Sequence, residues 1–168
     1  MALTLINEAG LSTSNSYASL ASAGLFIEEN IHITGTWASL STANRESCLI
    51  YATSLLDLQM DWIGTRGSSI QALGWPRDDA ETPDGYAVTT TDIPIAIQRG
   101  CAFYAYYLSQ DDRIAESDTF GFKSLKAGSL AMAIDKYDRK NVMPNPVWSM
   151  VMAYGSRSSG RSRVLERR

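Results

Sequence analysis

Apolar residues recur at three- and four-residue spacing in several segments of the chain, which predicts amphipathic helices. One helix is expected to end near residue 29, a second to span about 42–60, and a third to end near residue 109. A last short helix is expected to start at Pro144 and stop at Gly155. The residues expected to begin the first three helices are short polar side chains and one proline: Ser14, Asn15, Ser16, Ser41, Thr42, Asp92 and Pro94.

The apolar period changes to two near the C-terminal third of the chain, which predicts a β-hairpin over 119–137. The segment 62–92 is rich in glycine, proline and acidic residues and is expected to be a long loop, because no helix crosses its two prolines. Residues 32–37 are also expected to form a loop. Ala2–Ile6 alternates weakly and is expected to be an edge strand or an N-terminal arm.

These elements predict a mainly α fold, a small bundle of about four helices with a β-hairpin and extended N- and C-terminal arms. The expected organisation is an N-terminal arm over 1–13, a helical domain over 14–155 and a basic arm over 156–168. The residues expected in the core are apolar and fall on the predicted inner faces: Tyr17, Leu20, Leu49, Leu55, Leu56, Ile97, Tyr104, Leu108 and Trp148.

Charge is unevenly placed along the 168 residues, which carry a formal net charge of -3. Residues 156–168 hold five arginines and one glutamate, whereas residues 1–155 hold ten basic and seventeen acidic residues. An acidic body is not a general nucleic-acid binder. The basic segment has too little apolar surface to fold alone, so we expect an arm that is drawn to an acidic partner or a neighbouring subunit. We expect no secretory signal, because Met1 to Glu8 lack a basic stretch and a long apolar stretch. We expect no membrane partner, because no run of 18 apolar residues occurs.

Residues that carry chemistry are sparse in the sequence. His32 is the one histidine, and Cys48 and Cys101 are too few and too far apart for a zinc site. The acid pairs Asp78-Asp79 and Asp111-Asp112 lie in predicted loops or helix ends and look like solvated charge. No phosphate-binding glycine loop is present. We therefore expect no catalytic, cofactor-binding or metal site, and a protein that is not an enzyme.

Four stretches of sequence together resemble one known family. In this order and spacing they are similar to the head–tail connector (adaptor, or head completion) proteins of tailed bacteriophages, some of which are labelled DnaT-like single-stranded-DNA-binding proteins. The stretches are Asn15-Ser16-Tyr17, Trp37-(x)2-Leu40-Ser41, Ala52-(x)4-Asp57, and Gly74-Trp75-Pro76-Arg77 followed by Ile93-Pro94.

The resemblance implies a structural virion protein that forms a ring, commonly of about twelve copies, beneath the portal. It implies no cofactor. The implied partners are other copies of the chain, the portal protein, and the tail or next connector protein. Packaged DNA is implied to pass through the ring without specific contacts. The implied location is the virion neck, with assembly in the host cytoplasm.

Two groups of residues are expected to make the contacts of such a ring. The portal-binding residues are expected in the basic segment: Arg157, Arg161, Arg163, Val164, Leu165, Arg167 and Arg168. The residues expected to contact neighbouring subunits lie in the long loop and the hairpin: Trp62, Arg66, Trp75, Arg77, Phe120, Phe122, Lys123 and Lys126.

Two other functions stay open. A single-stranded nucleic-acid-binding module would use Trp62, Arg66, Trp75 and Arg77 to stack bases and contact phosphates, although Asp78 follows at once. A small hydrolase would have to depend on the single histidine or the acid pairs.

One further acid pair has two interpretations. Asp57 and Asp61 lie four residues apart near the end of the second predicted helix, where a carboxylate is mildly unfavourable against the helix dipole. They either meet a cation or a neighbouring arginine, or are two solvated acids.

Overall fold

The computed structural model describes residues 3–30, 32–115, 124–127, 130–133 and 141–158. The described part is mainly α-helical and includes a β-hairpin, which confirms the predicted fold class. No described helix combines the length and apolar content needed to cross a membrane. The α-helices are α1 (Leu20–Glu28), α2 (Thr34–Ser39), α3 (Thr42–Gln59), α4 (Ile95–Leu108) and α5 (Asn145–Val151).

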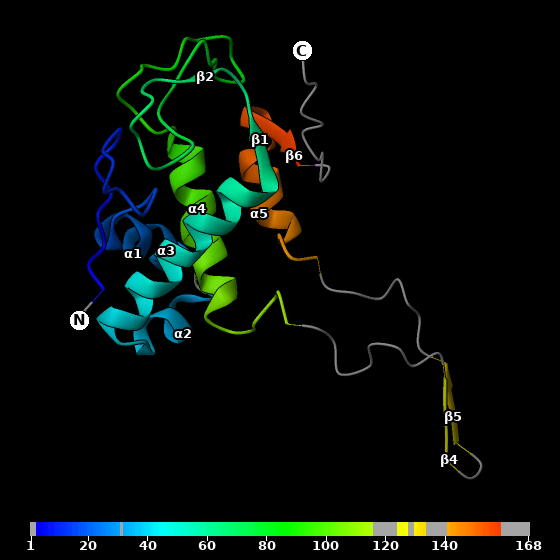
Figure 1. The fold of residues 1–168 in the computed structure, drawn as a ribbon. Coiled ribbons are helices and arrows are strands. Elements are labelled where there is room, and N and C mark those ends of the chain that lie inside the picture. The colour runs from blue at the N-terminus through cyan, green and yellow to red at the C-terminus, as the bar shows by residue number, and fades with distance from the viewer. Residues whose placement is uncertain (1–2, 31, 116–123, 128–129, 134–140, 159–168) are drawn as a thin grey trace.

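Helix α4 lies at the centre of the helical body and packs against α1, α3 and α5 (Figure 1). Its side chains Ile97, Cys101 and Tyr104 are fully buried. The wide apolar stripe of this helix is the sequence feature that favours a central position, because a helix that is apolar over most of its surface must be covered on several sides.

Three short two-stranded antiparallel sheets accompany the helices. The strand β1 (Met60–Trp62) pairs with β6 (Gly155–Arg157), and Met60 is opposite Arg157. β2 (Thr65–Arg66) pairs with β3 (Arg77–Asp78) inside the long loop. A 3₁₀ turn, η1 (Met152–Tyr154), joins α5 to β6.

The hairpin consists of β4 (Ser124–Ala127) and β5 (Leu130–Ala133). Leu125 is opposite Met132, and Ala127 is opposite Leu130. These strands lie within the predicted range 119–137, and the outer parts of that range are outside the described residues. Figure 1 places the hairpin apart from the helical body, and it pairs with no other described strand.

All nine residues expected in the core are fully or partly buried. Leu20, Leu108 and Trp148 are partly buried and pack against the rim of the core. The fully buried ones are Tyr17, Leu49, Leu55, Leu56, Ile97 and Tyr104.

The starts of α1 and α4 differ from the prediction. Ser19 caps α1 and forms a capping box with Ser22, so the helix begins later than the caps expected at residues 14–16. Pro94 occupies the cap position of α4 without a side-chain hydrogen bond. The Asp92 carboxylate instead accepts a hydrogen bond from the Thr89 hydroxyl at 2.5 Å.

Two segments that were expected to be irregular are ordered. Residues 34–39 form the short helix α2, although 32–37 was expected to be a loop. The basic arm was expected to begin at residue 156, but Ser156 and Arg157 belong to β6. The arm therefore starts from a paired strand at the helical body. Residues 159–168 lie outside the described part of the chain.

Replacing Gly64 by alanine is expected to destabilise the protein more than replacing Gly85. Both residues have a positive φ, +69° and +80°, which costs a side chain about 1 kcal/mol. A Cβ at Gly64 would also lie 2.2 Å from the backbone oxygen of Asp78, whereas nothing lies within 4 Å at Gly85. We expect a loss of about 2–3 kcal/mol for Gly64→Ala and about 1 kcal/mol for Gly85→Ala in urea unfolding. Equal losses would contradict the close β2–β3 packing.

Candidate functional site

The carboxylate of Asp57, near the end of α3, accepts hydrogen bonds from three separate parts of the chain. The Tyr17 hydroxyl and the Trp62 indole N–H donate to Oδ1, the latter at 2.9 Å. The backbone N–H of Gly74 donates to Oδ2 at 2.9 Å. Asp57 is partly buried, its oxygens accept hydrogen bonds from these neutral donors, and it links α3 to the N-terminal segment and to the long loop.

Gly74 lets the loop approach this carboxylate closely. A Cβ at Gly74 would lie 2.6 Å from Asp57 Oδ1 and 2.8 Å from the Trp62 ring. The next residue, Trp75, is 0% exposed. Its ring meets Trp62 and Tyr154 edge to face, with centroid separations of 6.1 and 5.8 Å. Such T-shaped contacts are favourable for aromatic rings.

Arg77 holds the loop in place through backbone carbonyl groups. Its guanidinium donates to Ile63 O at 2.5 Å, to Gly64 O at 2.6 Å and to Gly74 O at 3.0 Å. Partial burial is the main reason that its pKa is lowered from the usual arginine value. The hydrogen-bond donors of the Arg77 guanidinium are therefore used by backbone carbonyl groups of the protein itself.

Asn15 fixes the N-terminal segment in a similar way. The N–H of Ile6 donates to Asn15 Oδ1 at 2.7 Å, and Asn15 Nδ2 donates to Thr4 O at 2.8 Å.

Burial, and then the nearby Asp57 carboxylate, raise the pKa of Tyr17 well above its usual value. Asn15, Tyr17, Asp57, Trp75 and Arg77, which the sequence motifs single out, thus stabilise the interior and the loop.

A family model matches residues 1–164 of the chain. The family is described as "Putative DnaT-like ssDNA binding protein". The chain belongs to this family. No curated protein and no solved structure gives a significant match. The family agrees with the label that some of the resembling proteins carry, and the match itself names no head–tail connector.

In this DnaT-like chain, the four residues expected to bind single-stranded DNA do not form one exposed surface. Trp75 is completely buried, which excludes both base stacking and contact with a neighbouring subunit in this conformation. Trp62 is partly buried and donates its indole N–H to Asp57, and Arg77 is bound to carbonyl groups. Arg66 is exposed on β2. The arrangement leaves one free cation and no exposed aromatic pair among these four.

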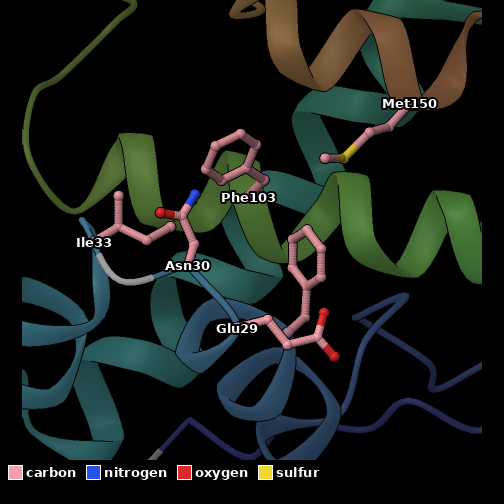
Figure 2. Close-up of a pocket in the computed structure, with 6 residues that line it drawn as sticks. Glu29, Asn30, Ile33, Phe103 and Met150 are labelled. Carbon is pink, nitrogen blue, oxygen red and sulfur yellow. The ribbon is translucent and has the colours of Figure 1, made fainter.

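An apolar groove lies on another face, between α1, α4 and α5. One end has a volume of about 320 Å³ and is lined by Phe26, Ile33, Phe103 and Met150 together with Glu29 and Asn30. Figure 2 shows Met150 extending from α5, and the Phe103 ring projecting from α4 next to Asn30. The rings of Phe26 and Phe103 meet edge to face at 6.2 Å.

The groove continues along α1 and α4 toward the start of α4. Its second part, of about 220 Å³, shares Phe26 and Glu29 with the first and adds Leu25 and Ile95. Leu25 and Ile95 are each 66% exposed, which is unusual for neighbouring large apolar residues. Arg99 lies over the Phe26 ring at 5.4 Å. We call these two parts together the α1–α4 groove.

Sequence reasoning missed the α1–α4 groove because its residues come from three separate helices. Leu25 fits the three- and four-residue spacing of the apolar positions in the first helix, which predicts a buried side chain, whereas it is 66% exposed. The available signal was the number of apolar residues in α1 and α4, which exceeds what one buried stripe accommodates.

The single histidine is exposed, whereas Cys48 is partly buried and Cys101 is fully buried. His32 is exposed, and its backbone N–H donates to Asn30 Oδ1 at 3.2 Å. Burial raises the pKa of Cys101 to about 11, which keeps its thiol protonated. Burial also raises the pKa of Cys48. Among the described residues, no three metal-ligating side chains come together.

Two other predicted contact residues lie in described strands. Lys126 belongs to β4, and Arg157 belongs to β6, where its guanidinium lies 4.8 Å from the centre of the Trp148 ring. The remaining predicted contact residues are outside the described part of the chain: Phe120, Phe122, Lys123, Arg161, Arg163, Val164, Leu165, Arg167 and Arg168.

Proposed function

We propose that this protein is a structural virion component, a head–tail connector that assembles as a ring of about twelve copies beneath the portal of a tailed bacteriophage. The observation that carries the proposal is where two groups of side chains lie, those of the sequence motifs and the large apolar ones that are exposed. The aromatic and arginine residues of the sequence motifs are used inside the fold, whereas large apolar residues are exposed along the α1–α4 groove. Exposed apolar surface of this kind is typical of a protein that binds other proteins.

The hairpin β4–β5 also supports an assembly role. A two-stranded hairpin is marginally stable alone in water, and this one pairs with no other described strand. We infer that the hairpin is stabilised by a neighbouring subunit or the next component of the neck. The acidic character of residues 1–155 suits a channel wall that does not retain passing DNA.

We also propose that the protein is not an enzyme, and that its location is the virion neck after assembly in the host cytoplasm. The most deeply buried thiol, Cys101, has the Thr53 hydroxyl as its neighbour at 3.2 Å. Neither group is accessible to a substrate, since both residues are 0% exposed.

Single-stranded DNA binding is the second candidate function. The family description supports it, and so do the five arginines of residues 156–168. The comparisons favour this candidate over the connector. The buried position of Trp75 and the bonding of the Arg77 guanidinium to backbone carbonyl groups argue against nucleic-acid contacts at these two residues. The nucleic-acid contacts would then lie in the basic segment rather than in the Trp62–Arg77 region.

A titration with a labelled single-stranded oligonucleotide separates the two candidates. The connector predicts no binding tighter than about 100 μM at about 150 mM salt, as expected for weak non-specific attraction. The second candidate predicts a micromolar Kd that weakens steeply with salt, with a slope of about -3 for four neutralised phosphates. Changing Arg161 and Arg163 to glutamine should then weaken binding, whereas Arg45→Gln should not, because Arg45 is bonded to Leu40 O at 2.9 Å.

The portal interaction is tested in the same preparation. Full-length protein mixed with the portal protein encoded in the same genome should co-migrate with it in a density gradient. Migration of the protein at its own position, together with micromolar oligonucleotide binding, would contradict the connector and support the second candidate.

A further inference from the structure

The α1–α4 groove has the properties of a site for a short apolar segment. Its floor is formed by the rings of Phe26 and Phe103, and its open end carries Leu25 and Ile95 at 66% exposure each. The exposure of these residues shows that nothing in the described part of the chain covers them. A groove of this kind typically binds two or three apolar anchors from one partner segment.

The charge around the groove favours a basic occupant. Glu29 lines both parts and is exposed. Glu28 is exposed beside it. Arg99 is the one cation that lines the groove, and it lies against the Phe26 ring. The groove is therefore apolar with a weakly acidic rim.

The C-terminal segment of the chain has the complementary composition. Ten residues follow Ser158, and their only large apolar residues are Val164 and Leu165. Arg163 precedes this pair, and Arg167 and Arg168 follow it. The segment therefore offers two adjacent apolar anchors between cations, as the groove requires.

The path of the chain directs this segment away from its own groove. Ser158 donates its N–H to Gln59 O at 2.8 Å, beside the β1–β6 sheet. Helix α4 contacts both α1 and α5, and β6 follows α5 on the side away from α1 (Figure 1). Helices α4 and α5 therefore separate β6, the last described strand, from α1 and from the groove of the same chain (Figure 1).

We propose that the segment 159–168 of one copy binds in the α1–α4 groove of a second copy, with Val164 and Leu165 as the anchors. The inference deepens the proposed connector function and rests on its self-assembly. The contact joins two different surfaces, so it repeats from copy to copy and closes into a ring when the rotation permits. It replaces the portal with a neighbouring subunit as the partner of the arm.

A complementation experiment with full-length variants tests the proposal. One variant carries Val164→Ser and Leu165→Ser, which removes the anchors and keeps every arginine. The other carries Leu25→Lys and Ile95→Lys in the groove, at positions exposed enough to tolerate the change. At about 100 μM, where a contact with micromolar Kd is occupied, the unaltered protein should sediment as oligomers larger than a dimer.

Each variant alone should sediment as a monomer, and an equal mixture should give a heterodimer. The mixture stops at two copies because it offers one intact segment and one intact groove. Leu58→Lys is the matched control, since Leu58 is 72% exposed on α3, outside the groove, and should leave the association unchanged.

Three results would overturn the proposal. They are a monomeric unaltered protein at this concentration, a mixture that stays monomeric, and loss of association in the Leu58→Lys control. Failure of the inference can be told from failure of the proposed function with the unaltered protein, which would still join the portal if only the inference fails. If the protein binds no portal but gives the heterodimer, the inference stands and the connector does not.

Discussion

Replacing Trp75 by alanine should lower the free energy of unfolding by about 3–5 kcal/mol, the cost of removing a large aromatic side chain from a packed interior. Trp75 is 0% exposed, and its ring packs edge to face with Trp62 and Tyr154. Unfolding in urea, followed by circular dichroism, measures the change.

Two further variants test whether the loss of stability in Trp75→Ala comes from the buried aromatic ring. The buried indole N–H of Trp75 has no hydrogen-bond partner among the described residues, so Trp75→Phe should retain more than half of the lost stability. Tyr86→Ala removes an aromatic side chain that is 73% exposed and should change the stability by less than about 0.5 kcal/mol. A loss below about 1 kcal/mol for Trp75→Ala would place this ring on the surface, where it could stack a base.

Replacing Asp57 by alanine should cost about 3 kcal/mol, because three donors lose their acceptor and at least two of them are buried. These donors are the Tyr17 hydroxyl, the Trp62 indole N–H and the Gly74 backbone N–H. The same unfolding measurement applies. The long loop should also become more sensitive to limited proteolysis, since Asp57 is one of the groups that attach it to the helices.

Asp61→Ala is the matched control for the carboxylate. Asp61 lies four residues further on, in β1, and its side chain is exposed. Its removal should change the stability by less than about 0.5 kcal/mol. Equal losses at the two positions would show that a general charge effect, rather than the three hydrogen bonds, determines the stability.

Long helices with a clear stripe were predicted well. The second helix was expected over 42–60 and spans Thr42–Gln59, because its apolar positions recur without a break and Ser41 caps it. The start of α1 was predicted less well, since several serines precede it. Tertiary contacts determine which serine caps the helix. Asn15 binds the N-terminal segment, and the Tyr17 N–H donates to Thr53 Oγ1. These residues are therefore not part of the helix, which begins after Ser19.

The short elements could not be predicted from local sequence. β1 and β6 are three residues each and exist only because segments almost a hundred residues apart pair with each other. Helix α2 contains Gly35, which argued for a loop, but Ile33 and Trp37 lie four residues apart and are both buried. That spacing was the available signal for α2.

The sequence pointed to the motif residues, but it did not predict that they form internal contacts of the fold. Tyr17, Asp57 and Gly74 lie far apart along the chain, and the packing of the N-terminal segment and of the long loop against α3 brings them together. A residue set that is specific enough to mark a family therefore marks, in this protein, the internal contacts that fix the fold. The exposed large apolar residues Leu25 and Ile95 are elsewhere, in the α1–α4 groove.

The most direct test of the connector is an image of the assembled neck. Full-length protein is mixed with the portal protein of the same genome, and the particles are viewed end-on and side-on by negative-stain electron microscopy. The proposed function predicts an added annular layer on one face of the portal, with a central opening. Portal particles that look the same with and without the protein would contradict it.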